Sequence, residues 1–99
     1  MYGTVALMRL KPGAEAKLRE HLKVYEQANI PGFQFSYLYR LDEGQNAYIM
    51  VAGFQSKDAY AANASSPEQH ARYLEYRELL ADEPQWHDGE IDYAFTTTG

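Results

Sequence analysis

The sequence predicts an α+β protein with the ferredoxin-like order β-α-β-β-α-β, in which helices cover one face of a four-stranded antiparallel sheet. Three observations support this prediction. Four segments are rich in strand-forming residues, two regions between them carry apolar residues at helical spacing, and proline or glycine separates most of these segments. With 99 residues, the chain is long enough for one small domain, which we expect to span residues 1–99.

The first expected strand covers residues 2–10 and is rich in apolar side chains on both of its faces. Pro12 and Gly13 end it, and a helix over residues 14–28 follows. Pro31 lies just beyond this helix, which cannot continue through a proline. The helix has an apolar stripe that should face the core: Leu18, Leu22, Tyr25 and Ala28.

Two further strands are expected over residues 33–41 and 47–54, joined by a hairpin loop. The first of them is strongly aromatic, and the second is apolar on both faces. Two short helices cover only one face of a sheet, so this apolar surface exceeds what the chain itself can bury. The excess predicts a second copy of the chain, arranged as a twofold homodimer.

The second helical region is expected in two parts. Ser56 should cap a short helix that continues to Asn63. Ser66 should cap the next helix, with Pro67 at its first position. Gln69 lies three residues after Ser66, which is the spacing of a capping box.

The last strand is expected after Pro84, over residues 85–96. Its side chains alternate between two faces. On this pattern His87 points inward with Ile91, toward a pocket or a dimer contact. Asp88 then falls on the opposite side, which we interpret as a solvated edge that discourages aggregation.

Composition excludes several classes of function. The net charge of -5 gives no electrostatic reason to bind nucleic acid or an anionic membrane. The absence of cysteine excludes disulfides and thiolate metal sites, and it fits the cytoplasmic location that we expect. The three histidines show no short ligand spacing, so we expect no metal site. Nine tyrosines favour a small aromatic ligand, because tyrosine joins a large ring to a polar tip.

Several short motifs, taken in order, resemble a known family. Lys11–Pro12–Gly13 follows the first strand, Ile30–Pro31–Gly32–Phe33 precedes the second, and Phe54–Gln55–Ser56–Lys57–Asp58–Ala59–Tyr60 leads out of the third. With Ser66–Pro67 further on, they resemble the antibiotic biosynthesis monooxygenase superfamily over nearly the whole chain. The resemblance implies a dimeric α+β barrel in which the two sheets face each other. It also implies one pocket per subunit, between sheet and helices.

The resemblance implies a reaction as well. Some members oxidise polyphenolic substrates with molecular oxygen and no metal or organic cofactor, and others degrade haem. At positions used by the haem-degrading members this chain has Ala6, Asn63 and Tyr73, which do not match. We therefore expect a monooxygenase without a cofactor, acting on an aromatic, polyketide-like or quinol substrate. The alternative is a non-catalytic dimer of the same fold that binds a small molecule or serves as an accessory protein.

The resemblance also suggests site residues. Tyr60 matches a tyrosine that is implicated in substrate binding or proton transfer in the cofactor-free members. Asn63 is shared with those members, and Phe54 stands where they have a tryptophan. We therefore expect Tyr60 to be catalytic, with Asn63 and Phe54 binding the substrate.

Three polar residues of the last helix form a second group. His70, Tyr73 and Arg77 have helical spacings of three and four, which place them on one side of the helix. They could pack at the edge of the apolar stripe, with Arg77 extending to solvent. Alternatively they line a cavity, with His70 as general base, Tyr73 as hydrogen-bond donor and Arg77 as anion clamp. On the second interpretation His70 and Tyr73 are catalytic, and Arg77 and His87 bind the substrate.

Overall fold

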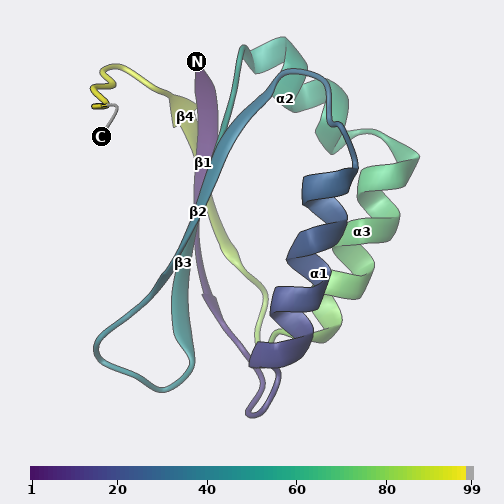
Figure 1. The fold of residues 1–99 in the computed structure, drawn as a ribbon, viewed down its shortest axis with the longest axis vertical. Helices are drawn as coiled ribbons and strands as arrows, with labels where there is room; N and C mark the ends of the chain where they lie inside the picture. The colour runs from purple at the N-terminus through teal and green to yellow at the C-terminus, as the bar shows by residue number, and fades with distance from the viewer. Residues whose placement is uncertain (98–99) are drawn as a thin grey trace.

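The computed structural model describes residues 1–97 and shows a four-stranded sheet with three helices on one face (Figure 1). The elements in chain order are β1 (Tyr2–Arg9), α1 (Glu15–Gln27), β2 (Phe33–Arg40), β3 (Ala47–Phe54), α2 (Lys57–Ala64), α3 (Pro67–Glu78) and β4 (Gln85–Glu90). The strands are antiparallel and lie in the order β2-β3-β1-β4. The predicted ferredoxin-like fold is therefore confirmed. Residues 98 and 99 of the predicted domain lie outside the described part.

The last strand is shorter than predicted. It ends at Glu90, and residues 91–97 form no regular element. Among the described residues, 1–97, β4 pairs only with β1, and its final partner is Tyr2, at the first position of β1. The Ile91 amide still donates to the Met1 carbonyl at 2.8 Å, after which β1 offers no further residues. The alternating pattern of residues 85–96 thus extends past the end of β1, so its last residues have no residues of β1 to pair with.

Two turn positions explain how the helical layer is attached to the sheet. Asn29 follows α1 with φ 49°, the left-handed conformation that commonly ends a helix. Gly32 precedes β2 with φ +78°, and a Cβ there would lie 2.6 Å from the Cβ of Ala59. Glycine is therefore required for two reasons, since this turn packs directly against α2.

Serine caps begin both of the later helices, as predicted. Ser56 Oγ accepts a hydrogen bond from an amide of α2, and Ser66 Oγ accepts one from the Gln69 amide, each at 3.1 Å. The capping box is only half formed. Gln69 Oε1 accepts from Arg72 Nε at 3.1 Å, while the Ser66 amide donates to the Asn63 carbonyl.

The core lies between the sheet and the helices. Its buried cluster draws on β1, β3 and the two longer helices and consists of Met8, Leu10, Leu18, Tyr48, Tyr76 and Leu80. The other face of the sheet carries no helix within residues 1–97 (Figure 1). Val5, Leu7, Tyr37 and Tyr39 are exposed there, with both tyrosines 57% exposed. The apolar excess predicted from the sequence is therefore present in the structure of this chain.

Candidate functional site

A hydrogen-bonded pair joins α2 to the edge strand β4. The Tyr60 hydroxyl donates to Asp88 Oδ1 at 2.9 Å. Asp88 lies opposite Thr4 in the β1–β4 register, and Thr4 is buried beneath the helices. Because directly opposed residues of an antiparallel pair point to the same face, Asp88 is on the helix-facing side of the sheet. Asp88 is exposed at the edge of the sheet, as predicted, but it lies on the helix-facing side and has a specific partner.

Aromatic rings fix the position of Tyr60. Its ring lies 5.3 Å from that of Tyr2 and 5.4 Å from that of Phe54, where the contact is edge to face. Phe54 is buried and makes a second edge-to-face contact with Phe33 at 5.5 Å. Such contacts are stabilising and orient the rings. Tyr60 and Phe54, both predicted site residues, are thus brought together.

Burial and the neighbouring carboxylate set the protonation state of Tyr60. Burial first, and then the hydrogen bond to Asp88, raise the pKa of Tyr60 to about 12. The hydroxyl therefore remains protonated at neutral pH and acts as a donor. Of the two groups, Asp88 is the one that can accept a proton from a ligand.

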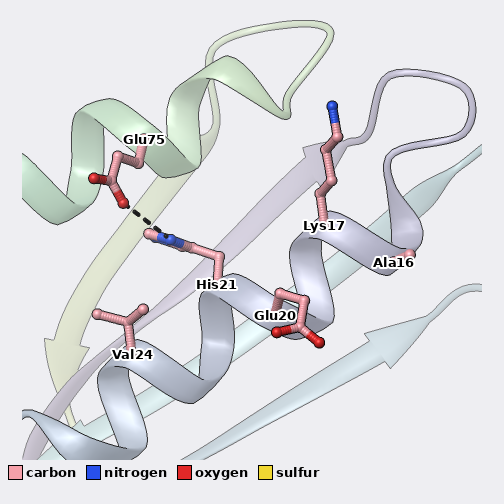
Figure 2. Close-up of a pocket in the computed structure, with 6 residues that line it drawn as sticks. All are labelled: Ala16, Lys17, Glu20, His21, Val24 and Glu75. Carbon is pink, nitrogen blue, oxygen red and sulfur yellow. Dashed lines mark ion pairs between the residues drawn. The ribbon is translucent and has the colours of Figure 1, made fainter.

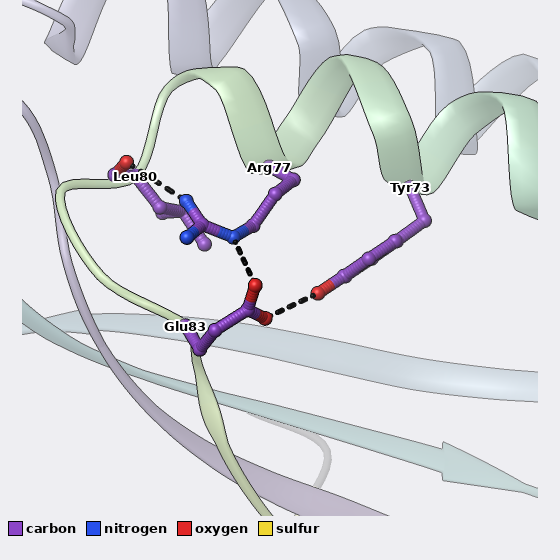
Figure 3. Close-up of polar contacts among 4 residues, drawn as sticks. All are labelled: Tyr73, Arg77, Leu80 and Glu83. Atoms are coloured by element: carbon purple, nitrogen blue, oxygen red, sulfur yellow. Dashed lines mark hydrogen bonds and ion pairs between the residues drawn. The ribbon is translucent and has the colours of Figure 1, made fainter.

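A second polar group lies at the end of α3 (Figure 3). The Tyr73 hydroxyl donates to Glu83 Oε2 at 3.3 Å, and Arg77 Nε lies 3.0 Å from Glu83 Oε1. This second distance is that of an ion pair, but the Nε–H does not point at an acceptor, so it forms no hydrogen bond. Arg77 also donates from Nη1 to the Leu80 carbonyl at 3.1 Å. Glu83 therefore occupies both side chains, and Arg77 is not a free anion clamp in this conformation.

Strand β4 connects the two groups. Trp86 lies opposite the buried Ala6, so it points to the same face as Asp88. Its ring lies 6.3 Å from the ring of Tyr73, and it is 41% exposed. We call the row of four side chains Tyr60, Asp88, Trp86 and Tyr73 the β4 strip. Two of the three predicted catalytic residues, Tyr60 and Tyr73, belong to it.

The other predicted site residues lie elsewhere. His70 is exposed, so the prediction that it faces a cavity is wrong. His87 is also exposed and pairs with Val5 on the helix-free face, so it does not point toward the helices. Asn63 lies one turn after Tyr60 on α2, and its Oδ1 accepts from Arg72 at 3.4 Å.

Two functional candidates were missed by the sequence analysis. Asp88 was assigned to the wrong face of β4, although taking the large apolar Trp86 as inward-facing would have placed Asp88 correctly. His21, on α1, is only 8% exposed. Its Nδ1 lies 3.6 Å from Glu75 Oε2, and its ring packs edge-on against Tyr25.

Two surface hollows lie beside α1. One, of about 430 Å³, lies between α1 and α3 and is lined by Ala16, Lys17, Glu20, His21, Val24 and Glu75 (Figure 2). The other, of about 640 Å³, lies between α1 and the β2–β3 hairpin. Neither is lined by Tyr60, His70 or Tyr73. The β4 strip is thus a row of polar and aromatic groups beside the edge strand, in which the Trp86 ring is partly exposed.

Metal and membrane sites were sought as well. Within residues 1–97, no three or more His, Cys, Asp or Glu side chains come together in a way that could hold a metal ion. No helix in that range has the length and apolar character needed to cross a membrane.

Comparison with known proteins places the chain in a family. No curated protein sequence matches it. Among solved structures it is similar to SnoaB, a cofactor-independent oxygenase from Streptomyces nogalater, with TM-score 0.79, 18% identity and 97% of each chain covered. It is also similar to candidate antibiotic biosynthesis monooxygenases from Deinococcus radiodurans (TM-score 0.77, 15% identity, 100% of both chains) and Caulobacter crescentus CB15 (0.77, 21%, 95% of this chain and 90% of that one). At these identities the likeness shows a shared fold. The family model for antibiotic biosynthesis monooxygenases matches residues 1–74, and the chain therefore belongs to that family.

Proposed function

We propose that this protein is a monooxygenase that works without a cofactor on an aromatic, polyketide-like or quinol substrate. The observation that carries the proposal is the Tyr60–Asp88 hydrogen bond at 2.9 Å, on a surface flanked by aromatic rings. Family membership and the similarity to a cofactor-independent oxygenase add support.

The proposed reaction needs one proton acceptor and one hydrogen-bond donor. Asp88 removes a proton from the substrate, which leaves an electron-rich anion able to react with molecular oxygen. A new carbon–oxygen bond forms at a CH₂ carbon of the substrate, and the resulting peroxide anion takes the proton back from Asp88 to give a hydroperoxide. Loss of the second C–H proton and of hydroxide, together one water, then leaves a carbonyl at that carbon. One oxygen atom enters the product and the other leaves as water, and the substrate supplies all four electrons that reduce O₂, because its CH₂ carbon is oxidised to a carbonyl.

The donor in this proposal is Tyr60. Because its pKa is raised to about 12, its hydroxyl keeps its proton, and once it turns away from Asp88 it can donate to a substrate oxygen and stabilise negative charge there. Asn63 lies one turn further along α2, and we propose that its amide binds a second polar group of the substrate. Phe54 acts as a positioning residue, since its ring holds that of Tyr60.

The aromatic part of the substrate is proposed to lie against Trp86 and Tyr73. The Trp86 ring is partly exposed and tilted by 51° to that of Tyr73, so the two rings form an angled surface rather than a stack. A flat ligand can contact one ring face to face and the other through its edge. Arg77 would contribute only after releasing Glu83.

Oxygen uptake in the presence of a hydroxylated anthrone tests the function. The expected result is one O₂ consumed for each quinone formed, with one atom of ¹⁸O₂ retained in the product, in protein treated with a chelator. Mass spectrometry of the product and an oxygen electrode give the two measurements. Saturable binding of the anthrone without oxygen uptake above the buffer rate would instead support the alternative, a non-catalytic binding or accessory protein.

We also propose that the protein is a homodimer formed through the helix-free face of the sheet. Val5, Leu7, Tyr37 and Tyr39 are exposed there, and a sheet-to-sheet interface of this kind should bury more than about 2,000 Å² in total. Light scattering should report a dimer at micromolar concentration, and Val5→Glu should shift the protein toward monomer. Ala61→Glu adds the same charge on the exposed side of α2 and should remain dimeric. A monomeric wild type would contradict the proposal.

A further inference from the structure

The larger hollow, of about 640 Å³, is distant in the sheet from the β4 strip. It is lined by Arg19, Leu22, Leu38, Arg40, Leu41, Asp42, Gly44 and Tyr48. These residues belong to α1, β2, the following loop and the start of β3. Because the strand order is β2-β3-β1-β4, the hollow and the β4 strip lie toward opposite edges of the sheet.

The floor of this hollow is apolar and continuous with the core. Leu22 and Leu38 are partly buried and pack against the core cluster. Tyr48 is 5% exposed, and its hydroxyl makes no hydrogen bond to another residue in the 1–97 range. A ligand that enters the hollow would therefore meet an apolar surface already held in place, with a free hydroxyl beside it.

The rim is positively charged. Arg19 comes from α1, and Arg40 lies directly opposite Tyr48 in the β2–β3 register, which puts both side chains on the same face. Both arginines are exposed, and neither forms an ion pair with any residue between 1 and 97. Asp42 is the one acidic residue that lines the hollow. The chain as a whole is negatively charged, with a net charge of -5, whereas the lining of this hollow has two arginines and one aspartate.

We propose that this hollow binds a small organic carboxylate with a flat apolar body. A guanidinium group matches a carboxylate in shape and charge, and Arg19 and Arg40 approach from two elements. The apolar body would cover Leu22 and Leu38, next to the ring of Tyr48. A volume of about 640 Å³ is within the range of small-molecule sites. This ligand site is separate from the oxygenation site and does not depend on the proposed reaction.

Equilibrium binding of 2-naphthoate to the full chain is the test. Calorimetry should give saturable binding of 2-naphthoate. The neutral analogue 2-naphthol lacks the carboxylate, and inorganic phosphate lacks the apolar body. Each should therefore bind at least about tenfold more weakly. Carbon-13 methyl shifts should locate the probe at Leu22, Leu38 and Leu41. Phosphate binding as tightly as 2-naphthoate would overturn the proposal, as would shifts confined to the region of Tyr60 and Asp88.

Two variants remove one charge each from the rim. Arg19→Gln and Arg40→Gln should each weaken 2-naphthoate binding about tenfold, since each removes a charge-assisted contact. Lys17→Gln removes the same charge from α1 but lines the other hollow, and it should bind normally. Oxygen uptake should be unchanged in all three variants. Equal binding by both arginine variants and wild type would overturn the proposal, whatever the result of the oxygen assay.

Discussion

Asp88→Asn should slow oxygenation of a hydroxylated anthrone by roughly 100-fold or more, because it removes the proposed general base while leaving the shape of the side chain. Asparagine can still accept a hydrogen bond from Tyr60, so the loss of rate would come from the missing proton acceptor. The protein should keep its fold, since Asp88 is exposed and lies at the edge of the sheet. Initial rates at saturating anthrone give the measurement.

The pKa of Tyr60 reports whether Asp88 acts on it directly. In the wild type, burial and the Asp88 hydrogen bond hold this pKa at about 12, so the neutral hydroxyl is favoured by the folded state. In Asp88→Asn the pKa should fall, yet stay above its ordinary value of 10.0 because burial remains. Ultraviolet absorbance of tyrosinate against pH measures this shift, and Tyr60→Phe identifies the component that belongs to Tyr60.

Two comparison variants separate the general base from other effects. Asp92→Asn makes the same chemical change two residues beyond β4, and it should leave the rate unchanged. His70→Ala removes the residue that the sequence suggested as the base, and its exposed position leads us to expect little effect. If His70→Ala lost the activity and Asp88→Asn kept it, the general base would have to be reassigned to His70.

The fold was predictable because its main signals are local. Ser66 and Pro67 mark the start of a helix by the chemistry of its first turn, whatever packs above it. The side chains of β1 likewise alternate between two faces as the period of a strand requires, with Ala6 and Met8 buried and Val5 and Leu7 exposed on the helix-free face.

The site was less predictable because it depends on which face each side chain occupies. β4 is a short edge strand with polar residues on both faces, so its pattern allowed two registers, and a shift of one residue exchanges His87 with Asp88. In α3 the buried stripe is centred on Tyr76. At 100° per residue His70 lies about 120° away from Tyr76, which takes it out of the stripe. Tyr73 lies about 60° away and is half buried.

Leu80→Ala should lower the free energy of unfolding by about 2–5 kcal/mol. Leu80 is 0% exposed and belongs to the core cluster. It also forms an isolated antiparallel β-bridge with Leu10, another member of that cluster. Truncating it removes buried apolar surface and leaves a cavity at the point where the chain passes from α3 back to the sheet. Urea denaturation at a fixed protein concentration measures the change, since a dimer would make stability depend on concentration.

Leu74→Ala is the matched control for this prediction. It makes the same substitution on α3 at a side chain that is 51% exposed, so it should change the free energy of unfolding by no more than about 0.5 kcal/mol. The midpoint of denaturation should therefore move for Leu80→Ala alone, with the urea dependence unchanged in both variants. Equal destabilisation by the two variants would mean that Leu74 is buried in the protein in solution. The exposed side of α3 would then be part of an interface that the structure of the single chain does not show.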